Sequence, residues 1–212
     1  ALADLGVGAG DLAALAHRLA DLRAALDAQV AEAAARVARL QAGDVVIDHA
    51  GFIGLPVEIR RRLLLAAVLW INSAEYGPRG ADLERFRAAA EAGRAATLAG
   101  CQMTMANAVL RLGREPRAVA GLTAGAGAVW DGRWRVSGPD SNGLTVAALG
   151  DHGLLSCPDW RQTGLPRRTL LAGPALWRQD VLVAAPLAGW GVGWQVQCDA
   201  PKGPLAAAPL SH

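Results

Sequence analysis

An indole lies among guanidinium groups near the middle of the chain, where residues 130–136 read Trp-Asp-Gly-Arg-Trp-Arg-Val. Asp-Gly between apolar residues predicts a two-residue hairpin turn, because both central positions of a type I′ turn need positive φ. Since side chains alternate along a strand, we expect Trp130, Arg133 and Arg135 on one face of the hairpin. The other face would carry Val129, Trp134 and Val136. The first face could bind phosphates or stack on bases, and it could equally be a structural cation–π cluster.

Arginine supplies nearly all of the positive charge, since Lys202 is the only lysine in a chain of formal net charge +2. The charge is uneven: residues 57–135 hold twelve arginines against seven acidic residues, whereas residues 1–56 hold four against seven. Planar guanidinium groups suit bidentate contacts with phosphate. The basic middle therefore suggests a nucleic-acid partner, although a compositionally biased genome also produces Ala-, Arg- and Gly-rich sequences.

Six arginines of this basic middle are candidates for contacts with nucleic-acid phosphates. Turns and helix ends present guanidinium groups without burying them, which favours four of the six. The other two belong to a run of three helical arginines, of which at least one must point toward a neighbouring element. That run also lies near the positive end of the expected helix dipole, an unfavourable place for cations that hints at function. The candidates are Arg79, Arg94, Arg133, Arg135, Arg60 and Arg61.

The cysteine, histidine and acidic residues do not have the spacing of a metal site or of an acid–base pair. The three cysteines, Cys101, Cys157 and Cys198, form no C-x-x-C pair, and the four histidines are scattered. Asp151 and His152 lie near Cys157, which is the nearest approach to a ligand cluster. Buried or half-buried thiols are the favoured interpretation. We expect no catalytic residue, no cofactor-binding residue and no metal site in this chain.

The first part of the chain has helical patterns. Asp11 can cap a helix that runs to about Gln41, with leucines at the spacing of a seven-residue repeat and Gly43 just past its end. Such a helix could connect two domains or form a dimeric coiled coil, but its alanine-rich seam favours packing within one chain. Pro56 starts a second helix to about residue 72, whose apolar second half must be buried. A third helix covers residues 82–92 and ends at Gly93.

Near residue 94 the apolar period becomes that of strands. Strands are expected at 95–98, 101–105, 108–112, 115–119, 144–149, 175–177 and 181–183, with an earlier one at 45–47. Short helices are expected at 154–161 and 166–171. The predicted class is α+β: a helical first part with one long helix, followed by a small, mainly-β domain with short helices. The predicted domains are a helical linker or substrate-binding region at 1–94, a C-terminal α+β domain at 95–198 and a disordered tail at 199–212.

No apolar run reaches the roughly 20 residues that span a bilayer, and no secretory signal precedes the first helix. We therefore expect a soluble, cytoplasmic protein with no membrane partner. The first residue is Ala1 instead of a methionine, which suggests a piece of a longer protein or a processed chain.

The order and spacing of several short motifs resemble the region downstream of the catalytic domain in tRNA(Ile)-lysidine synthetases. The resemblance covers roughly residues 10–195, and no single motif is as specific as a nucleotide-binding loop. Its motifs are the Pro56 helix with its arginine run, Pro78-Arg79, Gly93-Arg94-x-x-Thr97-Leu98-x-Gly100-Cys101, Arg114-Glu115-Pro116-Arg117 and Trp130-Asp131-Gly132-Arg133-Trp134. Later pieces are Gly150-x-x-Gly153-Leu154, Leu165-Pro166, Pro174-Ala175-Leu176-Trp177 and Pro186-Leu187-Ala188-Gly189.

The resemblance implies an ATP-dependent ligase that joins lysine to the wobble cytidine of isoleucine tRNA. In that family the catalytic domain adenylates the base at C2, and lysine then displaces AMP. ATP and Mg would bind in the catalytic domain, whose S-G-G-x-D-S loop lies before the region that this chain resembles. The implied partners are isoleucine tRNA and this N-terminal catalytic domain, and a homodimer is possible. The chain itself would be inactive and would hold the tRNA.

Residues 137–141 read Ser-Gly-Pro-Asp-Ser, like the family's ATP loop with one glycine deleted. A phosphate-binding loop of this type follows a strand and leads into a helix whose N-terminus holds the pyrophosphate. Here Asn142-Gly143 follows at once, and Leu144-Thr145-Val146 has a strand pattern. We therefore expect a surface turn here and no ATP binding by this chain. The rival hypothesis to tRNA binding is a structural or protein-interaction module that docks through the helix at 12–40.

Overall fold

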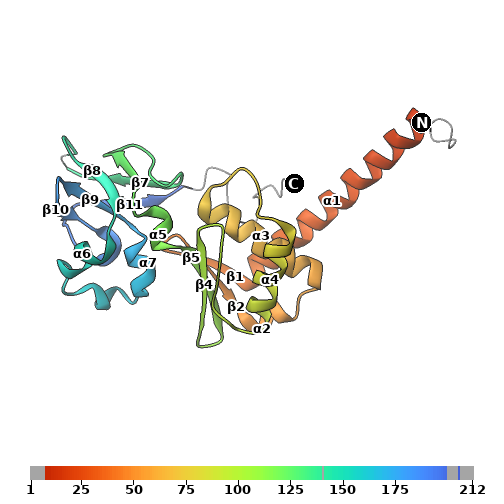
Figure 1. Ribbon diagram of the computed structural model, residues 1–212, viewed down its shortest axis with the longest axis horizontal. Helices are drawn as coiled ribbons and strands as arrows, with labels where there is room; N and C mark the ends of the chain where they lie inside the picture. The colour runs from red at the N-terminus through yellow and green to blue at the C-terminus, as the bar shows by residue number, and fades with distance from the viewer. Residues whose placement is uncertain (1–7, 140, 200–204, 206–212) are drawn as a thin grey trace.

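The computed structural model describes residues 8–139, 141–199 and 205. It combines helices with antiparallel sheets, which confirms the α+β class with one long helix at the start and a mainly strand-built part later. Figure 1 shows α1 projecting from one end of the molecule and the late strands gathered at the other end. Of the tail predicted at 199–212, only Asp199 and Leu205 belong to the described residues. The remainder of that prediction lies outside them.

Helix α1 (Ala9–Val37) is exposed through residue 25 and contributes buried side chains only from Val30 onward. It ends at Val37, before the predicted Gln41, because β1 (Ala38–Gln41) pairs with β2 (Asp44–Asp48) as an antiparallel hairpin. Gly43 is therefore a turn residue and not a helix cap. Ala42 and Gly43 have φ values of 51° and 76°, the positive pair that a type I′ turn requires.

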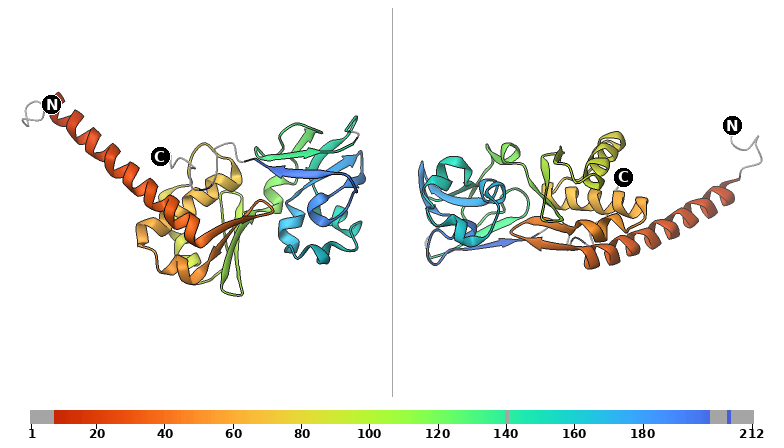
Figure 2. Two further views of the ribbon diagram at one scale, coloured as in Figure 1. Left: turned by 180° about the vertical axis from the view of Figure 1, so that it is seen from behind. Right: turned by 90° about the horizontal axis from the view of Figure 1, so that it is seen from below.

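The first sheet has five antiparallel strands in the order β1-β2-β5-β4-β3, with β3 (Ala96–Leu98), β4 (Cys101–Ala106) and β5 (Val109–Arg114). Helices α3 (Val57–Asn72) and α4 (Gly80–Glu91) lie on one side of it (Figure 2), and the short α2 (His49–Ile53) joins β2 to α3. The apolar second half of α3 is buried, as predicted. It packs with Ile47, Leu110 and Leu112 of the sheet in one core.

The change from a helical to a strand-like apolar period near residue 94 does not mark a boundary between two sheets. Strands β1 and β2 come from before this position, and β3, β4 and β5 come from after it, yet all five form one sheet. Gly93 has a φ of +62° and follows the end of α4, as predicted. The domain limits at 1–94 and 95–198 remain predictions.

The later part contains a four-stranded sheet in the order β10-β9-β8-β6 and a two-stranded sheet of β11 and β7. The strands are β6 (Thr123–Gly125), β7 (Trp134–Ser137), β8 (Thr145–Ala148), β9 (Pro174–Arg178), β10 (Val181–Ala184) and β11 (Gln195–Cys198). The helices are α5 (Pro116–Val119), α6 (Gly150–Leu155), η2 (Trp160–Thr163), α7 (Arg167–Leu171) and η3 (Pro186–Ala188). The strand predicted at 115–119 is wrong, because Pro116 begins a helical turn there.

The hairpin at Asp131-Gly132 has a different register from the prediction. Both residues have positive φ, at 47° and 66°, but Trp130 pairs with Trp134 instead of Arg133. One extra residue, Arg133, is therefore accommodated before β7 begins, as in a β-bulge. Trp130, Trp134 and Val136 are all buried. The prediction of one face shared by Trp130, Arg133 and Arg135 is wrong, because a one-residue shift changes which side chains enter the core.

Candidate nucleic-acid interface

Arg133 lies inside the protein, where it joins the two parts of the fold. Its side chain is 2% exposed, and Nη1 donates a 2.5 Å hydrogen bond to the carbonyl oxygen of Gly43. The guanidinium carbon lies 5.6 Å from the ring centroid of Trp70 and 5.4 Å from that of Trp134. Of the two alternatives for this arginine, the geometry is that of the structural cation–π cluster. The expectation that the turn would present the Arg133 side chain without burying it is wrong.

Asp131 completes this junction. Its carboxylate accepts hydrogen bonds from Nε and Nη2 of Arg114, at 3.1 and 2.9 Å, and lies 3.7 Å from Nε of Arg133. Arg114 also donates from Nη1 to the carbonyl oxygen of Gly100. The Arg-Glu-Pro-Arg and Trp-Asp-Gly-Arg motifs therefore meet through a side-chain network that aligns the second part of the fold on the first.

A second polar contact between the two parts is made by Asp44, whose side chain is 5% exposed. It accepts a 2.6 Å hydrogen bond from Oγ1 of Thr169 and a 3.0 Å hydrogen bond from Nη1 of Arg111. Burial raises the pKa of the Asp44 carboxyl, while the bonds from Thr169 and Arg111 oppose that shift. Nearby, Arg168 of α7 donates to Gln102 of β4 at 2.7 Å. These contacts are ones that sequence patterns alone did not predict.

Arg60 and Arg61 on α3 are engaged with carboxylates of the same helical layer. Arg60 pairs with Glu91 of α4 at 2.7 Å, and Arg61 makes two hydrogen bonds with Glu58 at 2.8 and 2.9 Å. The Arg61 hydrogen bond, opposed by burial, lowers the pKa of Glu58 to about 2. The positive charge of each guanidinium group is therefore partly neutralised by its carboxylate partner.

Arg79, Arg94 and Arg135 are exposed, as predicted. Arg79 is the N-cap of α4 and Arg94 follows its C-terminal end, so roughly 20 Å of helix separates them. Within the described residues, neither of these two side chains forms an ion pair or hydrogen bond. Nε of Arg135 in β7 lies 3.5 Å from Oδ2 of Asp199, and the Arg135 side chain is 54% exposed. These arginines are available to a ligand but do not converge on one pocket.

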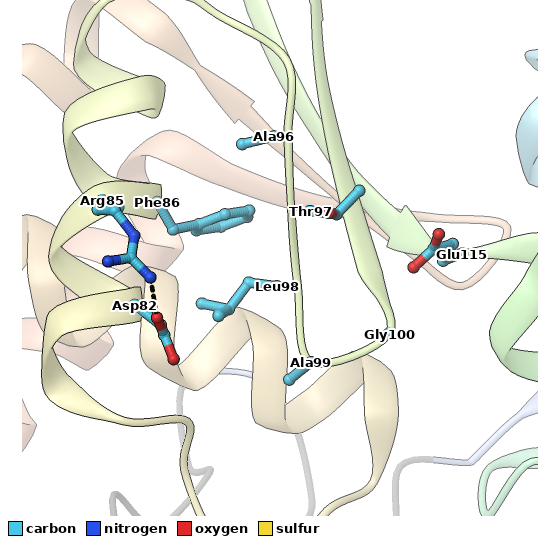
Figure 3. A pocket seen from close by; sticks show the side chains of 9 residues that line it. All are labelled: Asp82, Arg85, Phe86, Ala96, Thr97, Leu98, Ala99, Gly100 and Glu115. Atoms are coloured by element: carbon cyan, nitrogen blue, oxygen red, sulfur yellow. Dashed lines mark hydrogen bonds and ion pairs between the residues drawn. The ribbon is translucent and has the colours of Figure 1, made fainter.

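A groove of about 300 Å³ lies between α4 and the β3–β4 turn (Figure 3). Asp82 and Arg85 enter it from α4 and pair with each other, and Glu115 lines its far side. Phe86 and Leu98 lie between them. With two carboxylates and one paired arginine, this groove is poorly suited to an anion.

The face of the five-stranded sheet opposite α3 carries basic residues that were not among the predicted ligands. Arg39 of β1 is paired across the sheet with Val46 of β2, which is paired with Arg111 of β5. Arg36, in the last turn of α1, lies beside them in a groove of about 400 Å³. The signal that could have located them is the hairpin turn at Ala42-Gly43, which makes residues 38–41 a strand.

The segment 137–141 does not have the strand–loop–helix order of a phosphate loop. It leaves β7 at Ser137 and leads through a turn into β8. A side chain at Gly138 would meet the ring of Trp194 at 2.2 Å, so Trp194 occupies the space beside this backbone. Asp140 lies outside the described residues. The residues around it therefore do not fit ATP in the manner of a phosphate loop.

The cysteine and histidine side chains have structural surroundings. Cys101 and Cys157 are buried and Cys198 is half-buried, as predicted, and none of the three forms a disulfide. Burial raises the pKa of the Cys101 thiol to about 12. Asp151 pairs with Arg167, and His152 stacks on Trp177. The parts of the chain that the structure describes contain no group of three potential metal ligands. None of their helices combines the length and apolar content of a membrane span.

Comparison with known proteins connects these features to a family. Over 211 residues the chain is 42% identical to the tRNA(Ile)-lysidine synthase of Ruegeria pomeroyi, a match that covers all of this chain and 50% of that relative. The chain is a homologue of the tRNA(Ile)-lysidine synthases. A second synthase of this name, from Caulobacter vibrioides, is 40% identical over 113 residues, which cover 49% of this chain and 27% of that relative. No protein-family model matches the chain.

The resemblance to tRNA(Ile)-lysidine synthases that the motifs predicted is thus confirmed, and the match falls in the C-terminal half of the first relative. The chain spans about half the length of that tRNA(Ile)-lysidine synthase. Its junction residues Arg114, Asp131 and Arg133 belong to the motifs that first indicated this family. In this homologue these side chains hold the β7 hairpin against the five-stranded sheet, so some of the motif residues have a structural role.

Proposed function

We propose that this chain is the tRNA-binding portion of a tRNA(Ile)-lysidine synthase. The parent enzyme would use ATP and Mg to adenylate C2 of the wobble cytidine in isoleucine tRNA, and lysine would then displace AMP. The observation that carries this proposal is the match of all of this chain to half of a protein of that name. The parent would act in the cytoplasm, and ATP and Mg would bind in its N-terminal catalytic domain.

Exposed arginines support a role in holding the tRNA. Arg79, Arg94 and Arg135 present guanidinium groups at the surface, which suits contacts with phosphates. Arg60 and Arg61 are weaker candidates, because each is already paired with a carboxylate. Arg133 is withdrawn from the set, since a side chain that is 2% exposed cannot reach a ligand.

Binding of an isoleucine tRNA transcript, measured by fluorescence anisotropy at several salt concentrations, tests this proposal. Each phosphate contact should contribute a slope of roughly −0.7 to −0.9 to log K against log salt. Arg79→Ala, Arg94→Ala and Arg135→Ala should each weaken binding to all tRNAs alike and flatten that slope. Arg178→Ala, at an exposed arginine where β9 ends, is the matched control. Binding that does not depend on salt would contradict the proposal.

A second candidate function is a protein-interaction module that docks through α1, including a homodimer. It is favoured by four leucines on one stripe of the helix: Leu12, Leu15, Leu19 and Leu22 are 45% to 61% exposed. In a soluble single chain such a stripe usually has a partner. Within the segment 12–40 the stripe is confined to the projecting part, because Val30 and Val37 farther along the helix are buried and Leu40 lies in β1. A chain that associates with protein but shows no affinity for tRNA would favour this candidate.

A further inference from the structure

The open face of the five-stranded sheet has a regular arrangement of side chains. Arg39, Val46, Arg111 and Thr104 are consecutive cross-strand partners on β1, β2, β5 and β4. Side chains alternate along a strand, so this row points away from the core that Ile47 and Leu110 form with α3. Figure 2 shows α3 and α4 together on one side of the sheet. Helix α7 lies over one end of this face, where Thr169 bonds to Asp44 and Arg168 bonds to Gln102, and Thr104 and Arg111 border a small cavity beside it.

This row borders a groove of about 400 Å³. Val46 and Val109 form its apolar floor, Arg36 and Arg39 stand at its rim, and Asp48 lies at one end. Val46 is only 3% exposed, so the apolar surface that the groove offers to a ligand is mainly that of the half-buried Val109.

The charges at the rim are uncompensated. Arg36 and Arg39 are exposed, and neither has a carboxylate partner in the described part of the chain. Asp48 is committed to the N-cap of α2, where it accepts a 2.6 Å hydrogen bond from the backbone of Gly51. Arg36 also offsets the negative end of the α1 dipole, but that explanation does not extend to Arg39, which lies beyond the helix. The rim therefore attracts an anion beside an apolar floor.

We propose that this groove, which we call the sheet groove, binds one unpaired nucleotide of the tRNA. Its phosphate would lie between Arg36 and Arg39, and its base would lie against Val109, next to the buried Val46. Sequence-independent contacts to phosphate and contacts to the flat faces of unpaired bases are the usual means of holding single-stranded RNA. A groove of this size matches a small-molecule site, and an acidic peptide would leave its apolar floor unused. The inference rests on the proposed tRNA-binding function.

The test uses the 212-residue chain and an isoleucine tRNA transcript with a CAU anticodon. Arg36→Ala and Arg39→Ala should each lower affinity roughly four- to fivefold at about 0.15 M salt and flatten the salt slope by about 0.7 to 0.9. The double variant should combine both effects. Arg178→Ala, in the four-stranded sheet, is the control and should bind like the unchanged chain. The midpoints of thermal unfolding of all four variants should lie close to that of the unchanged chain, because these arginines are exposed and the contribution of Arg36 to the α1 dipole is small.

A photoreactive benzoylphenylalanine at Val109 provides a local measurement. It should cross-link to an unpaired nucleotide of the tRNA, and the Arg36→Ala/Arg39→Ala change should remove that cross-link. Cross-links only to paired nucleotides, or variants that bind like Arg178→Ala while tRNA binding persists, would overturn the nucleotide assignment and leave the proposed function standing. If the unchanged chain does not bind tRNA at all, both the nucleotide assignment and the proposed function are overturned. Displacement of the tRNA by poly-glutamate of equal charge would assign the groove to an acidic protein partner instead.

Discussion

The side chain of Arg133 hydrogen-bonds to the carbonyl oxygen of Gly43, ninety residues earlier in the chain. This contact crosses from the β7 hairpin to the β1–β2 turn. Around it, Trp134 and Trp70 cover the guanidinium group, and Asp131 links it to Arg114. An arginine in a motif of a tRNA-modifying family is therefore part of the scaffold, while its neighbour Arg135 is at the surface.

Arg133→Met should lower the free energy of unfolding by about 2 to 3 kcal/mol, because a hydrogen bond from a charged buried group is lost. Arg135→Ala should change it by less than about 1 kcal/mol, since the pair with Asp199 is exposed. Guanidinium denaturation of both variants measures the difference. In tRNA binding the order should reverse for correctly folded protein, with Arg135→Ala the weaker binder. Equal stability of the two variants would contradict the buried role of Arg133.

Gly43→Ala should destabilise the protein by roughly 3 kcal/mol or more. Its φ is +76°, and an added Cβ would meet the Trp134 ring at 2.2 Å, so backbone strain and overpacking combine. Gly143→Ala is the matched control: its φ is +68°, but nothing lies within 4 Å of the added atom. That variant should cost about 1 to 2 kcal/mol, from the backbone conformation alone. Similar midpoints of thermal unfolding for the two would show that the ring can move aside.

Glu58 predicts a pH dependence of stability. The hydrogen bond from Arg61 is the main cause that lowers its pKa from 4.5 to about 2 in the folded protein. A lowered carboxyl pKa stabilises the folded state above the unfolded pKa, and this contribution is lost as pH falls from about 4.5 to about 2. Because the Glu58 side chain is 44% exposed, the effect should stay below about 1 kcal/mol.

Glu58→Gln should remove this part of the acid sensitivity. The free energy of unfolding of the parent should fall more steeply between pH 4.5 and 2 than that of the variant, as measured by urea denaturation at a series of pH values. Arg85→Ala is a useful comparison, because its pair with Asp82 is more exposed. Parallel pH profiles for the parent and Glu58→Gln would contradict the assignment.

The leucine stripe of α1 predicts that substitutions in the first part of this helix affect stability less than substitutions in its last part. Leu15→Glu/Leu19→Glu should leave the free energy of unfolding of the monomer within about 0.5 kcal/mol of the parent, because both side chains are exposed. Val30→Ala, lower on the same helix, should cost about 1.5 kcal/mol, the equivalent of two buried methylene groups. Sedimentation at low concentration establishes the monomer for this comparison. A large loss of stability in the leucine variant would mean that the stripe is covered.

Local patterns along the chain were enough to predict the class of fold and the resemblance to a family. Apolar periods located α3, α4 and most strands, because each element must present one apolar face to a core. Gly93 and the Asp131-Gly132 turn were recognisable because positive φ strongly favours glycine and tolerates aspartate. The order of short motifs indicated the tRNA(Ile)-lysidine synthases, which the comparison then supported over the whole chain.

Where α1 ends and which arginines are buried depend instead on contacts between distant parts of the chain. Residues 38–41 extend a helical pattern, but pairing with β2 satisfies their backbone groups and makes them a strand. One bulged residue moved Arg133 from the expected surface into the junction and left Arg135 outside. Whether an arginine meets Asp131, Gly43 or solvent depends on partners up to ninety residues away. A local pattern contains no information about such partners, so only the folded chain separates the arginines that hold the scaffold from those that remain exposed at the surface.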